Sequence, residues 1–298
     1  MALGSLAPID RATLAYVAVA LTFQLARGPR AWPSGPLLIL GLLLVAAVAG
    51  GLAPRARRAG PLARLLAEVY PLLLTVGLYA HVGLVNAAHG VSHDALVQGW
   101  EQALFGSQPS LAWIRAFPSP AWSTLMHASY LSYYPIRAVS PLGLWALGRR
   151  DAARGAILLT MATFYVCYGV FLAFPVAGPR YLFPPAANAA TAVPVAAFTH
   201  RLLEGGSAWG TAFPSSHVAA ALVAAAAAGR GCRPLGAVLL PAAVLLSLAT
   251  VYCQLHYAVD ALAGAALAAA ALIAGRRAGY HSPLAAPVHG ASTPGDHR

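Results

Sequence analysis

The sequence predicts an all-α fold, a polytopic transmembrane helical bundle of about eight spans. Hydrophobic residues make up 59% of the 298 residues and charged residues only 9%, whereas soluble domains carry about a quarter charged residues. The apolar residues also form long runs, and the mean hydropathy is +0.67. This composition excludes an ordinary soluble enzyme and a disordered chain. It also excludes a basic nucleic-acid-binding domain, despite the formal net charge of +11.

Eight segments are candidates for spanning helices, which need roughly 20 mostly apolar residues. In chain order they are residues 12–26, 36–53, 65–88, 120–147, 156–174, 215–228, 235–254 and 257–274. The first and sixth are short for a span.

The arginines give an independent test of this topology. All 19 basic residues are arginine. With the N-terminus in the cytoplasm, 13 arginines fall in cytoplasmic segments and 5 outside, and Arg137 lies within the fourth span. Cytoplasmic loops of membrane proteins are enriched in basic residues. We therefore expect both termini in the cytoplasm. The absence of lysine is typical of a GC-rich bacterial genome, and we therefore expect the protein in a bacterial inner membrane.

Two long loops face the outside in this topology. Residues 90–119 carry several aromatic side chains, which suit short helices lying in the membrane interface. Residues 175–214 are proline-rich and include a predicted short helix over 195–203. Long loops on one face of a scaffold commonly carry the functional site. The polar, proline-rich tail after Gly279 is predicted to be disordered.

Three short segments with chemistry-bearing residues meet on the outer face. The last of them runs His256-Tyr257-Ala258-Val259-Asp260. On a helix, residues four apart share a face. A carboxylate bonded to one imidazole nitrogen fixes the tautomer and leaves the other nitrogen as a nucleophile. The alternative is a structural polar pair within the bundle.

The other two segments supply groups that suit an anion. Phe213-Pro214-Ser215-Ser216-His217 opens the sixth span, where a serine can cap the helix and free N–H groups can bind phosphate. His217 is then placed to protonate a leaving oxygen, or it is an ordinary interfacial histidine. In Gly178-Pro179-Arg180-Tyr181, Arg180 can grip phosphate oxygens or simply contact lipid headgroups.

Together, in order and spacing, these segments resemble the type 2 phosphatidic acid phosphatase superfamily, whose signature has an Arg-Pro, a Pro-Ser-Gly/Ser-His and a His-x-x-x-Asp segment. The likeness is nearest to its inositol phosphorylceramide synthase-like branch. That branch is indicated by Asp94, Leu104-Phe105-Gly106, Pro109, Tyr130, Tyr134-Pro135 and Tyr252-x-x-x-His256-Tyr257-x-x-Asp260.

The resemblance implies roles and boundaries. His256 would form a phosphohistidine, Asp260 would orient it and His217 would be the general acid. Arg180, Ser215 and Ser216 would hold the phosphate, and neither a metal nor a cofactor is expected. A six-helix core over residues 65–275 would follow two extra helices in 1–64 and precede the cytoplasmic tail 276–298.

Two phosphate-binding cations of the superfamily are replaced here, by Ala173, seven residues before Arg180, and by Thr250, six residues before His256. The synthase-like branch also tends to lack the second. Substitutes for the missing charge are Tyr181, His200, Arg201 and Tyr252, of which His200 and Arg201 are better explained as loop surface.

The fourth span carries polar side chains on one helical face, at His127, Tyr130, Tyr134 and Arg137. An arginine within a span is costly unless it faces protein or water. The stripe is either the wall of a headgroup cavity or a hydrogen-bonded seam between helices.

The expected function is therefore an enzyme that cleaves a lipid phosphate ester at the outer face, a lipid phosphate phosphatase. A phosphotransferase that moves a phosphorylated polyol headgroup, of the inositol phosphate type, to a lipid acceptor is the alternative. A non-catalytic lipid-binding or transport protein is a further one. The expected partners are a phosphorylated membrane lipid and, for transfer, a lipid or polyol acceptor.

Overall fold

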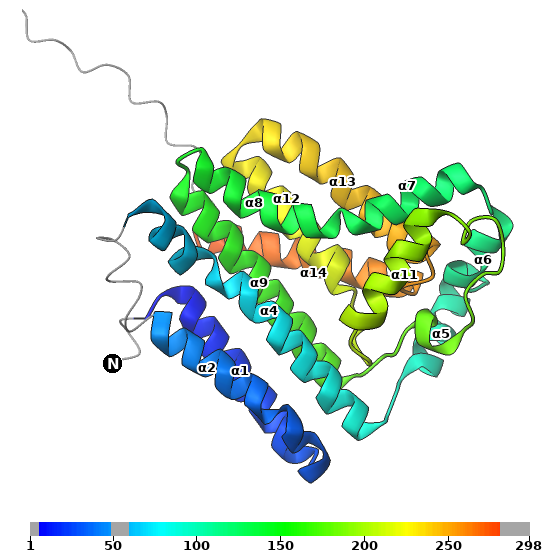
Figure 1. The fold of residues 1–298 in the computed structure, drawn as a ribbon, viewed down its shortest axis with the longest axis horizontal. Helices are drawn as coiled ribbons and strands as arrows, with labels where there is room; N and C mark the ends of the chain where they lie inside the picture. Colours follow the sequence, from blue (N-terminus) through cyan, green and yellow to red (C-terminus); the bar gives the residue numbers. More distant parts are fainter. Residues whose placement is uncertain (1–5, 49–59, 281–298) are drawn as a thin grey trace, which may run out of the picture.

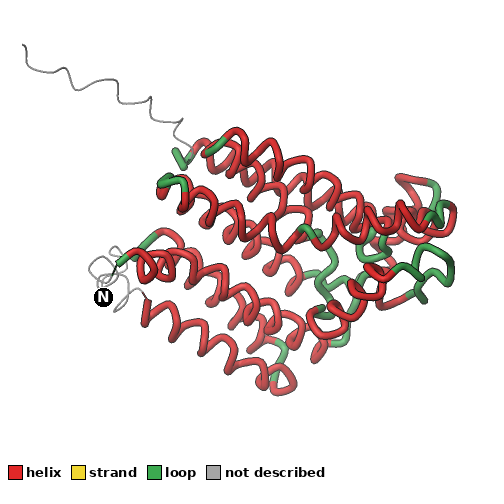
Figure 2. Tube along the Cα trace, turned by 45° about the horizontal axis from the view of Figure 1, so that its top comes forward, coloured by secondary structure: helices red, strands yellow, loops and turns green. Residues whose placement is uncertain are grey.

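The computed structural model describes residues 6–48 and 60–280 of the chain. Within these ranges every regular element is a helix, apart from one isolated bridge between Val176 and Thr211 (Figures 1 and 2). The predicted all-α fold is confirmed. The elements are α1 (Pro8–Ala26), η2 (Pro29–Ser34), α2 (Gly35–Ala47), α4 (Pro61–His89), α5 (Asp94–Phe105), α6 (Pro109–Ala116), α7 (Pro120–Leu131), α8 (Tyr133–Ala146), α9 (Arg150–Ala173), α10 (Pro179–Leu182), α11 (Pro194–Gly206), α12 (Ser216–Gly231), α13 (Arg233–Tyr252) and α14 (Ala258–Arg277).

Six helical stretches of the described chain are long and apolar enough to cross a membrane. They are α1, the continuous pair η2–α2, α4, α9, α13 and α14. The end of the predicted second span and the predicted disordered tail lie outside the described residues.

Helix α12 lies at the centre of the bundle although it has only 16 residues. It packs against α8, α9, α13 and α14. Its inward side chains are mostly alanine, and nearly all of them are buried. Small side chains let neighbouring helices approach closely, so α12 can be surrounded on four sides.

The prediction of one continuous span over residues 120–147 is wrong in detail. The segment forms two helices, α7 and α8, which meet at Ser132. Pro135 follows in the first turn of α8, where it supplies no N–H and its ring crowds the carbonyl of Leu131.

The N-terminal helices form a separate pair on the outside of the bundle (Figure 1). α1 packs against α9, and α2 packs against α4. Polar contacts also join the pair to the bundle, because the Tyr70 hydroxyl donates to Asp10, and the hydroxyls of Thr13 and Tyr165 lie 2.7 Å apart.

The shorter helices α5, α6 and α11 gather at one end of the bundle (Figure 1). We call this the site end, because α4 and α9 finish there and α12 and α14 begin there. Six arginines, Arg149, Arg150, Arg230, Arg233, Arg276 and Arg277, lie at the opposite ends of these spans. The loop predicted to hold short helices forms α5 and α6.

Candidate active site

A cavity of about 360 Å³ opens at the site end and reaches into the bundle. Its walls come from α4, α7, α8, α9, α10, α11 and α12, from the loop after α11 and from the turn between α13 and α14. His217 and His256 both line it, and their ring centroids are 5.6 Å apart. Arg180 lines it as well, so the cavity brings all three predicted segments together.

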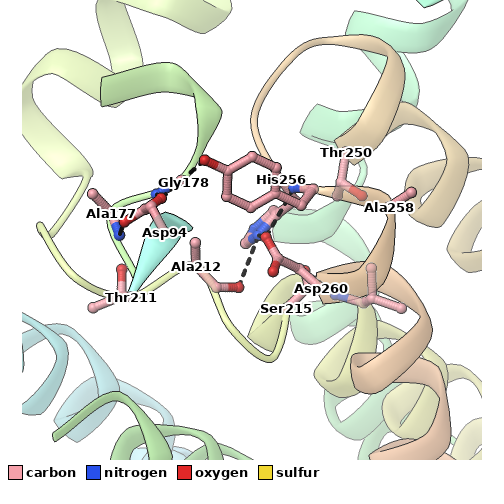
Figure 3. A network of polar contacts seen from close by, with 12 residues as sticks. Asp94, Ala177, Gly178, Thr211, Ala212, Ser215, Thr250, His256, Ala258 and Asp260 are labelled. Atoms are coloured by element: carbon pink, nitrogen blue, oxygen red, sulfur yellow. Dashed lines mark hydrogen bonds and ion pairs between the residues drawn. The ribbon is translucent and has the colours of Figure 1, made fainter. Parts of the chain in front are cut away.

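His256 sits in the turn between α13 and α14, where its backbone N–H donates to the Thr250 carbonyl. Its Nδ1 lies 3.0 Å from the carbonyl oxygen of Ala212 and 3.4 Å from Asp260 Oδ2 (Figure 3). Both neighbours are acceptors, so Nδ1 carries the proton and Nε2 keeps its lone pair. The free nitrogen belongs to a side chain that lines the cavity, as a nucleophile requires.

Asp260 is fully buried in the first turn of α14. The spacing of four residues predicted that His256 and Asp260 share one helical face, but the helix begins only at Ala258. Asp260 reaches back instead, in a capping arrangement in which its Oδ2 accepts from the Tyr257 N–H at 2.8 Å. The helix cap and the imidazole partner are thus the same carboxylate.

His217 occupies the first turn of α12 and faces His256 across the cavity. Its Nε2 is 3.2 Å from the Tyr130 hydroxyl, and its ring lies 4.4 Å from that of Tyr133. Two tyrosines therefore fix the imidazole in place.

The two serines beside it have different positions. Ser215 is the N-cap of α12, since its Oγ accepts from the Val218 N–H, and its own N–H donates to the Asp260 carbonyl at 2.9 Å. Ser215 is wholly buried and does not line the cavity, whereas Ser216 does. The expectation that both serines face the phosphate is corrected: the capping geometry points the Ser215 hydroxyl back into its own helix.

Arg180 and Tyr181 lie in α10, a single turn that follows α9. Both line the cavity. The Arg180 guanidinium donates to the Leu203 carbonyl at 3.0 Å and lies 5.7 Å from the centre of the Tyr181 ring. The Tyr181 hydroxyl donates to Ser207 at 2.8 Å. These contacts tie α10 to α11 and fix the approach of the guanidinium.

The polar stripe of the fourth predicted span lines the cavity on both sides of Ser132, except at His127. Tyr130, Tyr134 and Arg137 line the cavity. His127 does not, because α7 packs that face against α11 and α13, and its Nδ1 bonds to Ser123. The interpretation of His127 as cavity wall is therefore corrected.

The charge on the cavity wall is entirely positive. Two guanidiniums, of Arg137 and Arg180, line it together with the two imidazoles, and no carboxylate does. Neither arginine forms an ion pair in the part of the chain that the structure describes. Arg137 instead donates to the Tyr133 hydroxyl at 3.2 Å and lies over the rings of Tyr133 and Phe164. Such a site is suited to a multiply charged anion.

Comparison with protein families adds an independent observation. Residues 95–274 match the family model described as the PAP2 superfamily. The chain belongs to the PAP2 superfamily. The match covers more than half of the chain, from α5 to α14, and contains all three segments. Neither curated proteins nor solved structures gave a match.

Membership of the PAP2 superfamily supports a phosphatase- or phosphotransferase-type activity on lipid phosphates, and with the apolar helices it indicates an integral membrane protein. The synthase-like branch is tested by none of these observations and stays a prediction.

The structure shows where Ala173 and Thr250, which replace the two expected phosphate-binding cations, are located. Ala173 is the last residue of α9, and Thr250 supplies only its backbone carbonyl to His256. Of the suggested substitutes, Tyr181 alone lines the cavity. The Tyr252 hydroxyl donates to the Phe117 carbonyl, and Arg201 is exposed.

His200 lies in a smaller neighbouring cavity of about 170 Å³, which it shares with Arg180. Burial and the nearby Arg180 charge lower the pKa of His200, so it is a poor substitute for a fixed positive charge. Arg137, from a span outside the three segments, is the second guanidinium that faces the cavity.

Two further groups escaped the sequence argument. Tyr133 contacts both His217 and Arg137, and its place three residues after Tyr130 and four before Arg137 is a signal that could have found it. Glu101 in α5 is fully buried against the start of α14. Its spacing of seven from Asp94, two helical turns along one face, was the only sequence signal for it.

Proposed function

We propose that this protein is a lipid phosphate phosphatase that works through a phosphohistidine at His256, without a metal ion. The observation that carries the proposal is the orientation of His256. The Ala212 carbonyl and Asp260 hold Nδ1, while the ring faces a cavity that is lined by two guanidiniums and a second histidine.

The first half-reaction follows from this arrangement. A phosphate monoester enters the cavity, and its oxygens bind Arg180, Ser216 and Arg137. The Nε2 lone pair of His256 attacks phosphorus, so that an N–P bond forms and the P–O bond to the lipid alcohol breaks. His217 transfers its proton to the departing oxygen, and Asp260 stabilises the charge that develops on the His256 ring.

The second half-reaction releases the phosphate. A water oxygen attacks phosphorus, His217 accepts the water proton, and the N–P bond breaks. Inorganic phosphate leaves, and both histidines return to their starting protonation states. His217 thus acts as acid and then as base.

The site end is proposed to face the outside of a bacterial inner membrane, with both termini in the cytoplasm. The support is the six arginines at the opposite end of the spans, because basic residues favour the cytoplasmic side. The exposed apolar side chains of α5, among them Leu96 and Leu104, suit a helix lying in the outer interface.

The proposal is tested with purified protein in mixed micelles that contain phosphatidic acid or a polyprenyl phosphate, in the presence of a chelator. Phosphate release should occur, and a phosphate-labelled, acid-labile enzyme should be trapped from labelled substrate. His256→Ala should abolish both. His89→Asn changes an exposed histidine at the end of α4 and serves as the matched control.

Absence of turnover and of labelled enzyme with every lipid phosphate would favour the non-catalytic alternative. Labelled enzyme that persists in His256→Ala would overturn the assigned nucleophile.

Headgroup transfer is the second candidate function, and the size of the cavity favours it. About 360 Å³ falls in the range of pockets that enclose whole small molecules, so a phosphoryl group alone leaves room for a polyol. The tyrosine hydroxyls and Arg137 would then bind its hydroxyl groups. Adding inositol or glycerol, or a phosphoinositide with a lipid alcohol, should yield a transferred product in place of free phosphate if transfer is the activity.

A further inference from the structure

Helix α5 contacts all three segments of the site although none of its residues lines the cavity. The first contact is made by Asp94, which is 4% exposed. Its Oδ2 accepts from the Ala177 N–H at 2.7 Å and its Oδ1 from the Gly178 N–H at 2.8 Å (Figure 3). These two N–H groups belong to the turn that leads directly into Arg180.

The same carboxylate also reaches the segment of the nucleophile. Asp94 Oδ1 accepts from the Tyr257 hydroxyl at 3.0 Å, and Gln98 of the same helix donates to that hydroxyl at 3.0 Å. Tyr257 is completely buried and is the residue after His256. One carboxylate therefore joins the arginine loop to the nucleophile turn.

Two turns farther along α5, Glu101 makes the third contact. Its two carboxylate oxygens lie 3.1 and 3.2 Å from the N–H of Ala258, the first residue of α14. A carboxylate at a helix N-terminus is favourable because the end carries unpaired N–H groups and the positive end of the dipole. Glu101 thus fixes the start of the helix that carries Asp260.

Aromatic contacts complete the attachment. The Trp100 ring stacks on Phe174 at the end of α9 and meets Phe213 edge-on, with centroids 5.9 and 5.6 Å apart. Phe213 lies two residues before Ser215. All three segments are therefore fastened to one helix, whose rise of roughly 1.5 Å per residue separates Asp94 and Glu101 by about 10 Å.

We infer that Asp94 and Glu101 are positioning residues, and that α5 sets the separation between the Arg180 guanidinium and the His256 ring. The inference rests on the proposed function and deepens it. Because the two carboxylates act through other residues, their loss should lower turnover without removing any group from the cavity. A displacement of about 1 Å at a reacting group is enough to cost on the order of 100-fold in rate.

The first test is a double-mutant cycle with phosphatidic acid in mixed micelles. Asp94→Asn should lower kcat/KM by about 10- to 100-fold in the natural protein, mainly in kcat. In an Arg180→Ala background the same change should cost only about 3-fold, because the group that Asp94 positions is already gone. Equal factors in both backgrounds would mean that Asp94 is merely structural, and would overturn the inference.

Matched variants separate positioning from stability. Glu68→Gln and Asp151→Asn remove carboxylates that pair with Arg154 at the opposite end of the bundle. These two control variants should keep the natural kcat/KM. Asp94→Asn and Glu101→Gln should have a lower kcat/KM, although all four variants should have similar thermal stability. Tyr257→Phe removes one contact to Asp94 with little change in volume, and it replaces Asp94→Asn if that variant fails to fold. A fall of kcat/KM in the Glu68→Gln and Asp151→Asn controls equal to that of the α5 variants would contradict the inference.

Orthovanadate mimics the phosphoryl group in the transition state of its transfer, and its binding can be measured without turnover. Vanadate should raise the thermal unfolding midpoint of the natural protein. It should raise the midpoint of Asp94→Asn by a clearly smaller amount. An inactive natural protein that vanadate does not stabilise would refute the proposed function itself. An active natural protein with α5 variants that keep its activity and its vanadate shift would refute only the inference about α5.

Discussion

Replacing Asp260 by asparagine separates two effects that a carboxylate can have on a histidine nucleophile. It can fix the tautomer of the ring, and it can stabilise the positive charge that grows when the ring attacks phosphorus. In this protein the Ala212 carbonyl also accepts from His256 Nδ1, at 3.0 Å. The tautomer should therefore survive the substitution, and only the charge effect should be lost.

The size of that effect follows from the distance. Two unit charges at 3.4 Å interact by about 5 kcal/mol at an effective dielectric constant of ~20. If half of the charge has developed in the transition state, about 2.5 kcal/mol is lost, which is about 70-fold in kcat. By contrast, loss of the correct tautomer in a serine-protease triad costs about 10⁴-fold.

The assay compares kcat and KM of the natural protein and Asp260→Asn on phosphatidic acid in mixed micelles, with thermal unfolding measured in parallel. Asp10→Asn is the matched control, since Asp10 occupies the same third position of a membrane helix and bonds back to the Ala7 N–H. Both variants should show a similar small loss of stability, and Asp260→Asn alone should lose activity.

Two outcomes would refute this reasoning. A loss near 10⁴-fold would mean that the Ala212 carbonyl does not hold the tautomer. A loss below about 3-fold would mean that Asp260 serves the helix cap and contributes nothing to the developing charge.

Three further predictions follow from single contacts. Arg137→Met should lower kcat/KM by about 10- to 100-fold, because a charge-assisted hydrogen bond to the substrate is lost. The thermal unfolding midpoint should not fall. Unchanged kinetics would mean that Arg137 does not bind the substrate. Gly178→Ala should impair activity more than Gly106→Ala. Both glycines have a positive φ, but only at Gly178 would an added Cβ meet the side chain of Ala212, at 2.9 Å. Equal effects of the two variants in the phosphate-release assay would contradict this explanation. Burial raises the pKa of Glu101 to about 7, so the folded protein binds the proton of this carboxyl group more tightly than the unfolded chain does. The free energy of unfolding should therefore fall as the pH rises from about 4.5 to about 7. Glu101→Gln should lessen that fall in thermal-unfolding midpoints measured across the pH range, and an identical pH profile would show that Glu101 does not titrate there.

Part of the site was accessible from local spacing. The Ser215 cap and the place of His217 in the first turn of α12 follow from short-range rules, and the structure has both. The pairing of His256 with Asp260 was predicted from a shared helical face. In the structure their contact arises differently, because the Asp260 carboxylate caps α14 and reaches back across the start of the helix. Correct partners can thus arise from incorrect local geometry.

Other features depended on direction in space. Periodicity gave His127 the same face as Tyr130, Tyr134 and Arg137, but α7 packs against α11 and α13 at His127, so that only the other three reach the cavity. Which turns of a helix line a cavity depends on the neighbouring helices, and a one-dimensional pattern does not contain their packing.

The sequence by itself determined the membrane-embedded, all-α character of this protein, because burial of apolar runs in lipid depends on composition and length alone. It also indicated which segments carry the candidate site residues, because their residue types and spacing are local. Only the tertiary structure decided that Arg137 joins Arg180 in a cavity whose described lining holds no carboxylate, and that Asp94, Trp100 and Glu101 fasten all three segments to one helix. Those relations join residues up to 163 positions apart, as Asp94 and Tyr257 are, and such contacts exist only when the helices have packed.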